Sequence, residues 1–182
     1  MPDASESFLA GLVRHGGRPA LRGEGGELAY DRLPEAVAAC RALLDSVGAR
    51  RVALALDNGP QWALWDLALL ADGRVCVPLP GFFSPAQQAH VLDSAGVDTL
   101  IGDPAVAARV EGFVAVAAGS TATHRSAETG PVATGTAVSA REAPASAAGA
   151  SIFRRTPHSV PALPAGTVKI TYTSGTTGQP KG

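Results

Sequence analysis

Short apolar runs alternate with longer segments of helical periodicity between residues 31 and 116, and this alternation limits the fold more than any other feature. The clearest helical segment follows Asp31, a residue type that is favoured at the N-cap position. Its apolar residues return every three or four positions, as on one face of a helix: Leu33, Val37, Cys40 and Leu44. Further helices are expected over residues 5–16, 61–71 and 84–95, and strands over residues 51–56, 75–79, 97–101 and 113–116.

Strands that alternate with helices of about ten residues or more form parallel βαβ units. Because their crossovers are right-handed, the helices should cover both faces of one sheet. We therefore predict an α/β fold, built on a partial doubly wound parallel sheet with helices on both faces.

The composition changes to Ala, Gly, Ser, Thr and Pro from about residue 117 to residue 164, without a sustained hydrophobic period. Such segments bury too little apolar surface to fold by themselves, so we predict a largely disordered linker, with a cover over a binding surface as the alternative. The predicted organisation is an α/β subdomain over residues 1–116, this linker over residues 117–164, and a strand plus a loop over residues 165–182.

Charge and hydropathy exclude several kinds of partner. The net charge is -1, from 15 basic and 16 acidic residues, and no block of like charges offers a footprint for nucleic acid or an anionic membrane. No apolar stretch approaches the roughly 18 residues of a membrane span. The first residues are acidic rather than basic, so we expect a soluble, cytoplasmic protein.

The two cysteines and the histidines do not form a catalytic or metal-binding pattern. Cys40 and Cys76 lie in apolar segments, which predicts small core residues rather than ligands or nucleophiles. The four histidines are scattered along the chain and are expected at the surface rather than as general bases: His15, His90, His124 and His158.

The end of the chain carries the chemistry. An alternating β-branched run over residues 166–172 is followed directly by the segment Thr-Ser-Gly-Thr-Thr-Gly-Gln-Pro-Lys-Gly over residues 173–182. Two glycines allow close approach of backbone amides, four hydroxyls are donors, and Lys181 adds a positive charge, which together suit a polyphosphate. The spacing differs from a Walker A loop, because no Gly-Lys-Ser/Thr triplet is present. By composition alone, a solvated turn is the alternative.

The run Tyr-Thr-Ser-Gly-Thr-Thr-Gly-Gln-Pro-Lys-Gly over residues 172–182 resembles the signature loop of the adenylate-forming superfamily. That superfamily includes acyl-CoA synthetases, aryl-CoA ligases, luciferases and the adenylation domains of peptide synthetases. Residues 71–79 and the helix start at Ser84 resemble weaker segments of the same families, in the same order. Residues 117–164 add nothing to the resemblance.

The resemblance implies that the loop holds the β- and γ-phosphates of ATP while a carboxylate attacks the α-phosphorus. Carried over by position, the phosphate-binding residues are Thr173, Ser174, Gly175, Thr176, Thr177, Gly178 and Lys181, with Thr173 as a candidate contact of Mg²⁺. It further implies a carboxylic acid substrate, which we take to be a fatty acid, and the thiol of CoA or phosphopantetheine as the acceptor.

The resemblance places the other active-site parts of the family downstream, so no catalytic residue is identified in this chain. Lys169 is expected to have an edge role in the strand before the loop rather than that of the family's catalytic lysine. We predict that the chain alone is inactive and that an exposed sheet edge favours self-association. The alternative is a naturally truncated, non-catalytic binding or interaction module.

Overall fold

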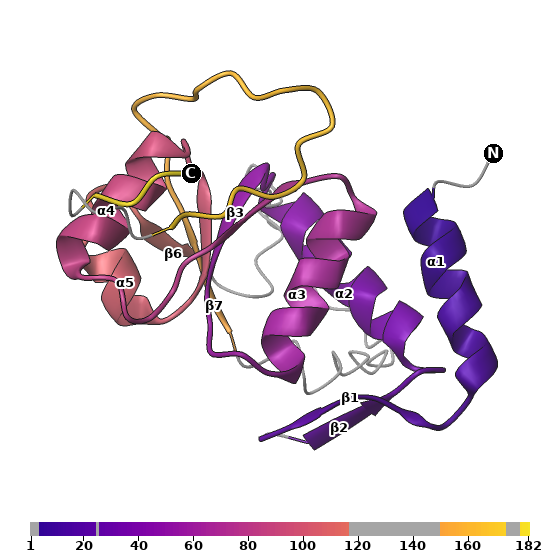
Figure 1. Ribbon diagram of the computed structural model, residues 1–182. Coiled ribbons are helices and arrows are strands. Elements are labelled where there is room, and N and C mark those ends of the chain that lie inside the picture. Colours follow the sequence, from indigo (N-terminus) through magenta and orange to yellow (C-terminus); the bar gives the residue numbers. More distant parts are fainter. Residues whose placement is uncertain (1–3, 25, 117–149, 174–178) are drawn as a thin grey trace, which may run out of the picture.

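The structure is a computed structural model, and it describes residues 4–24, 26–116, 150–173 and 179–182. Figure 1 shows the arrangement of its elements. The helices are α1 (Ala4–Leu12), the 3-10 helix η1 (Val13–His15), α2 (Leu33–Ser46), α3 (Pro60–Ala71), α4 (Pro85–Ser94) and α5 (Pro104–Ala108). The strands are β1 (Pro19–Gly23), β2 (Gly26–Ala29), β3 (Arg51–Ala55), β4 (Val75–Pro78), β5 (Thr99–Gly102), β6 (Val114–Val116) and β7 (Ser151–Arg154).

The main sheet has the strand order β4-β3-β5-β7-β6. β3 pairs in parallel with both β4 and β5, as the alternation of strands and helices predicts. β7 runs antiparallel to both of its neighbours, β5 and β6, so the sheet is mixed rather than wholly parallel. The predicted α/β class is confirmed, and the reversed strand is the departure from it.

β7 lies inside the range for which the sequence predicts a linker, and that prediction is wrong for these residues. Ile152 and Phe153 of β7 are each only 8% exposed and belong to the cores on opposite faces of the sheet. Two apolar residues between polar ones are too few to show a hydrophobic period. Residues 117–149 of the predicted linker, with His124, lie outside the described residues.

Helices cover both faces of the sheet. One hydrophobic cluster joins α2 and α3 to the sheet, and a second joins α4 and α5 to the opposite face. Successive residues of β3 alternate between them, since Val52 and Leu54 belong to the first cluster and Ala53 to the second. In Figure 1 the helices α2 and α3 accordingly lie on one side of the strands, with α4 and α5 on the other.

The predicted helix boundaries agree with the structure at some ends and differ at others. α4 begins after Ser84, whose side chain forms a capping box with Gln87, as expected for the Ser-Pro start. Asp31 is not the N-cap of α2, because the N-cap position is held by Arg32 without a side-chain hydrogen bond. Asp31 belongs instead to the turn after β2, in which the Arg32 amide donates to the carbonyl of Ala29.

Besides β7, the β1–β2 hairpin and the helix α5 were not expected from the sequence. The β1–β2 hairpin is antiparallel and separate from the main sheet, and its Gly-rich, charged strands have little apolar pattern. The short helix α5 begins after Asp103, whose carboxylate accepts a hydrogen bond from the amide of Ala105. The Asp-Pro pair at residues 103–104 is the local signal for this helix.

The segment that leads to the C-terminal loop lies at the free edge of β4. The Cys76 amide donates to the carbonyl of Val168 (2.9 Å), and the Ile170 amide donates to the carbonyl of Cys76 (2.9 Å). The strand expected over residues 166–172 is therefore present only as one parallel bridge, between Cys76 and Lys169. None of the helices described in the structure is long and apolar enough to cross a membrane.

Candidate functional site

The base of the C-terminal loop is closed by backbone hydrogen bonds. The Thr173 amide donates to the carbonyl of Lys181 (2.9 Å), and the Lys181 amide donates to the carbonyl of Thr173 (3.0 Å), which makes an isolated antiparallel bridge. The structure therefore brings together the first and last of the predicted phosphate-binding residues. The other five lie outside the described residues: Ser174, Gly175, Thr176, Thr177 and Gly178.

Both described ends of the loop present polar groups to solvent. Thr173 and Lys181 are exposed, and within the described ranges no carboxylate forms a salt bridge with the Lys181 ammonium. The Thr173 hydroxyl lies 3.5 Å from the Lys181 carbonyl oxygen, so it is held at the loop base. A hydroxyl and an ammonium are groups that bind an anion, and a hydroxyl oxygen is also a type of ligand that Mg²⁺ accepts. The described residues at the loop base therefore fit a polyphosphate with its metal ion.

α4 contacts both flanks of this loop. The hydroxyl of Tyr172 lies 2.8 Å from Ser94 Oγ, and His90 Nε2 lies 3.2 Å from the carbonyl oxygen of Pro180. In Figure 1 the last residues of the chain, coloured yellow, accordingly lie beside α4. His90, which was expected at the surface, is half-buried by this contact.

Lys169 has the edge role that the sequence predicts. Its ammonium lies 2.7 Å from Asp66 Oδ1 of α3 and 5.3 Å from the ring centroid of Trp62. This ion pair and cation–π contact attach the segment before the loop to α3. Trp65 of the same helix is fully buried, whereas Trp62 is partly exposed under Lys169.

The cysteines are core residues, as predicted. Cys40 and Cys76 are 0% and 1% exposed. Burial raises the pKa of each thiol from 9.0 to about 12, and the carboxylate of Asp66 adds to the rise at Cys76. Neither thiol is therefore a nucleophile at neutral pH. Among the residues that the structure describes, no three His, Cys, Asp or Glu side chains gather as they would around a metal ion.

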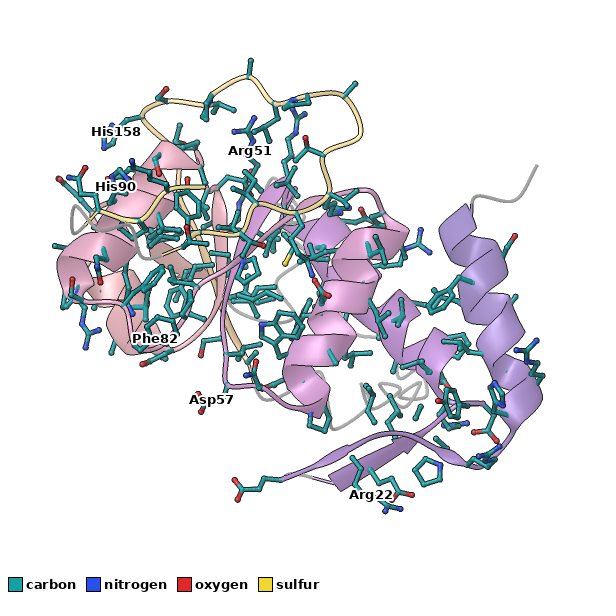
Figure 2. The ribbon with its side chains drawn as sticks, in the orientation of Figure 1. Arg22, Arg51, Asp57, Phe82, His90 and His158 are labelled. Carbon is teal, nitrogen blue, oxygen red and sulfur yellow. The ribbon has the colours of Figure 1, made fainter. Side chains whose placement is uncertain are left out.

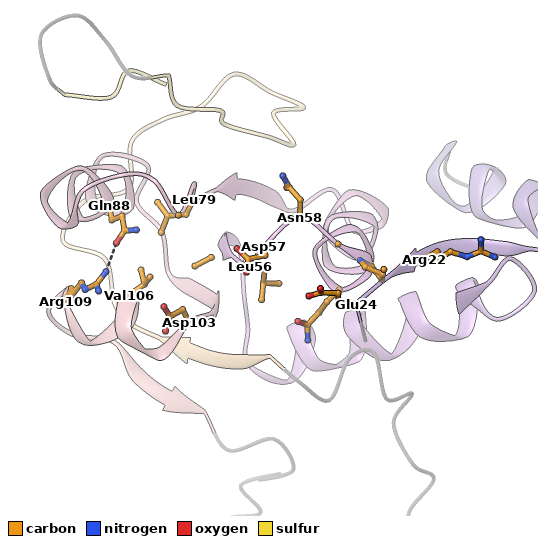
Figure 3. Close-up of a pocket in the computed structure, with 16 residues that line it drawn as sticks. Arg22, Glu24, Leu56, Asp57, Asn58, Leu79, Gln88, Asp103, Val106 and Arg109 are labelled. Carbon is orange, nitrogen blue, oxygen red and sulfur yellow. Dashed lines mark hydrogen bonds between the residues drawn. The ribbon is translucent and has the colours of Figure 1, made fainter. Parts of the chain in front are cut away.

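A separate cleft of about 830 Å³ opens where β3, β4 and β5 end (Figure 3). Its charged and amide side chains include Arg22, Glu24, Asp57, Gln88, Asp103 and Arg109. Arg109 donates to Gln88 Oε1 across 3.4 Å, along the dashed line in Figure 3. The sequence analysis missed this cleft, although polar residues placed shortly after predicted strands were a usable signal.

The cleft and the loop base do not coincide. Neither Thr173 nor Lys181 lines the cleft. Figure 2 shows Asp57 and Phe82 at one end of the sheet and Arg51 and His90 toward the other. Because His90 contacts Pro180, the described part of the loop lies with the second group.

Comparison with known proteins decides which family has this combination of sheet and loop. The sequence profile described as "AMP-binding enzyme" matches residues 10–182, nearly the whole chain. The chain belongs to the AMP-binding enzyme family. The family is the one that the resemblance of residues 172–182 indicates, and its members are nucleotide-binding ligases that form adenylates. A search of curated protein sequences found no match.

Two solved structures of similar fold agree with this membership. The N-terminal subdomain of NpsA from Klebsiella oxytoca is 25% identical, with a TM-score of 0.50 over 57% of this chain and 28% of that chain. The crystal structure of IdnL7 is 28% identical, with a TM-score of 0.50 over 61% of this chain and 24% of that chain. This chain therefore spans about a quarter of the length of the solved structures that it matches.

Proposed function

We propose that this chain supplies the first α/β subdomain and the phosphate-binding loop of an ATP-dependent acid-thiol ligase. Such an enzyme joins a carboxylate to AMP, releases pyrophosphate, and passes the acyl group to a thiol. The observation that carries the proposal is the exposed pair Thr173 and Lys181, held together backbone to backbone in a chain of the AMP-binding enzyme family.

Each described loop residue has a separate role in this proposal. Lys181 compensates the negative charge of the β- and γ-phosphates, because its ammonium has no described carboxylate partner. The Thr173 hydroxyl donates to a phosphate oxygen or lends its oxygen to Mg²⁺, which supplies further positive charge when bound. Together they hold the triphosphate still for attack on the α-phosphorus, so their contribution is positioning and charge stabilisation.

The sequence supports the same role for the intervening residues. The hydroxyls of Ser174, Thr176 and Thr177 are proposed as further donors, and Gly175 and Gly178 as the positions at which the backbone approaches the phosphates. These residues are part of the proposal through their sequence alone.

We further propose a fatty acid as the substrate and CoA or phosphopantetheine as the thiol acceptor. The support for an acyl-CoA synthetase is the resemblance of residues 172–182 to the signature loop of a superfamily that includes these enzymes. We also propose that the 182-residue chain alone is inactive, since the resemblance places the adenine, ribose and most acyl contacts beyond it.

ATP–pyrophosphate exchange tests the proposal in the complete natural protein that carries these residues, with a panel of fatty, aryl and amino acids. Lys181→Ala should lower exchange at least ~10-fold, because one charge-assisted contact is worth about 1.5–3 kcal/mol. Lys169→Ala is the matched control, because its ammonium is already paired with Asp66, and it should change exchange far less. Equal exchange by Lys181→Ala and the parent would refute the phosphate-binding role.

Two further outcomes test the inactivity of the isolated chain and the alternative of a non-catalytic module. Pyrophosphate release above background by the isolated 182-residue chain would refute its proposed inactivity. A complete protein that folds but does not bind MgATP would favour a non-catalytic binding module over a ligase.

The isolated chain is also proposed to self-associate through an exposed sheet edge. Among the strands that the structure describes, β6 is the outermost on its side of the sheet, and its Val114 side chain is 69% exposed. An open, apolar edge strand readily pairs with another chain. Size-exclusion chromatography at several concentrations should show a concentration-dependent shift, and a constant monomer would contradict the proposal.

A further inference from the structure

One face of α4 reaches both ends of the phosphate-binding loop. His90 and Ser94 are four residues apart on the helix, so their side chains lie on the same side. Ser94 contacts Tyr172, the residue before Thr173, and His90 contacts Pro180, the residue before Lys181. Residues that are far apart in sequence therefore meet at the loop base.

The chemistry of these contacts fixes the direction of each hydrogen bond. The Ser94 hydroxyl donates its only hydrogen to the carbonyl of His90, 2.6 Å away, so its oxygen accepts from the Tyr172 hydroxyl at 2.8 Å. A carbonyl oxygen only accepts, so His90 Nε2 carries the hydrogen that points to Pro180. Each contact is thus a defined donor–acceptor pair.

α4 is firmly held and can act as a fixed support. Its first turn is closed by the capping box of Ser84 and Gln87, and Val91 and Leu92 on its inner face are 0% exposed. Tyr172 also packs against the same hydrophobic cluster. The two polar contacts therefore connect the loop base to a helix that is anchored in the core.

We propose that His90 and Ser94 are positioning residues, which hold the Thr173–Lys181 bridge in the arrangement that receives the β- and γ-phosphates. This inference rests on the proposed phosphate-binding function. It adds that His90 and Ser94, some 80 positions upstream, set the affinity of the loop for the triphosphate although neither side chain contacts the triphosphate. Their loss should weaken binding of ligands that have a β-phosphate and leave AMP binding unchanged.

The test compares the affinities for MgATP and for AMP in the complete natural protein, by isothermal titration calorimetry. Single variants are His90→Leu, Ser94→Ala and Tyr172→Phe, with His90→Gln as the conservative change that keeps an N–H donor. Each of the three variants that remove a hydrogen bond should weaken MgATP binding about 2- to 10-fold, the range for one hydrogen bond. His90→Gln should keep most of the MgATP affinity. Ser94→Ala combined with Tyr172→Phe should be no worse than either alone.

The outcomes separate this inference from the proposed function. If Lys181→Ala weakens MgATP binding and the α4 variants do not, the positioning role is refuted while the phosphate-binding role stands. If Lys181→Ala has no effect, the proposed function fails first. Equal weakening of MgATP and AMP would show a general structural role and overturn the inference. Should His90→Leu fail to fold, Tyr172→Phe decides the question, since it removes only a hydroxyl and keeps the partly buried ring.

Discussion

Gly102 is the position at which one added methyl group should cost the most stability. It ends β5, pairs with Ala55 of β3, and precedes Asp103 on the wall of the cleft. Its φ is +134°, and a Cβ atom built on it would lie 2.0 Å from the carbonyl oxygen of Ala55. Real Cβ atoms do not approach an oxygen so closely, so β3 and β5 must separate in a Gly102→Ala variant.

The magnitude follows from three contributions. Holding an alanine at this φ costs about 1–3 kcal/mol. Forcing the strands apart costs about 1–3 kcal/mol, as in other overpacked sites. The displacement also weakens the hydrogen bond from the Asp103 amide to the Ala55 carbonyl (3.1 Å), worth about 1 kcal/mol. We expect a loss of about 3–7 kcal/mol in the free energy of unfolding.

Gly73→Ala is the matched control. Gly73 also has a positive φ, +62°, but an added Cβ would meet no atom within 4 Å. The free energy of unfolding of the Gly73→Ala variant should therefore fall by only about 1–2 kcal/mol, the cost of holding an alanine at a positive φ. The assay is urea unfolding at two protein concentrations, followed by tryptophan fluorescence, because Trp65 is fully buried. Equal destabilisation by the two variants would refute the steric reasoning.

The remaining predictions concern the thiols and the edge ion pair. Because burial raises the pKa of Cys40 and Cys76 from 9.0 to about 12, ionisation of the two thiols should not change the stability below pH 9.0. Stability should fall as the pH rises toward 12, since only the unfolded thiols ionise; a flat urea midpoint across that range would contradict this. Lys169→Met should cost up to about 1 kcal/mol at low salt and less at 1 M NaCl, as measured by urea unfolding. Combining Asp66→Asn with Lys169→Met should lower the stability little further, and additive losses would show that the two side chains do not interact.

Much of the fold followed from the sequence because its signals are local. The helical spacing of Leu33, Val37 and Cys40 predicts α2, and the Ser-Pro start predicts α4, since caps and periodicity act within a few residues. The same holds for the polar, glycine-containing run after Tyr172, whose donors and single cation favour a phosphate in any fold that exposes them. Its likeness to a known signature then indicated the family that the profile match confirmed.

Other features were decided only by the tertiary structure. β7 has two apolar residues and no visible period, and it is an inner strand because it pairs with β5 on one side and with β6 on the other. The cleft exists because the ends of three strands meet at one edge of the sheet. The contact of Ser94 with Tyr172 joins residues that are 78 positions apart. Such contacts depend on how the whole chain packs, so no short stretch of sequence can encode them.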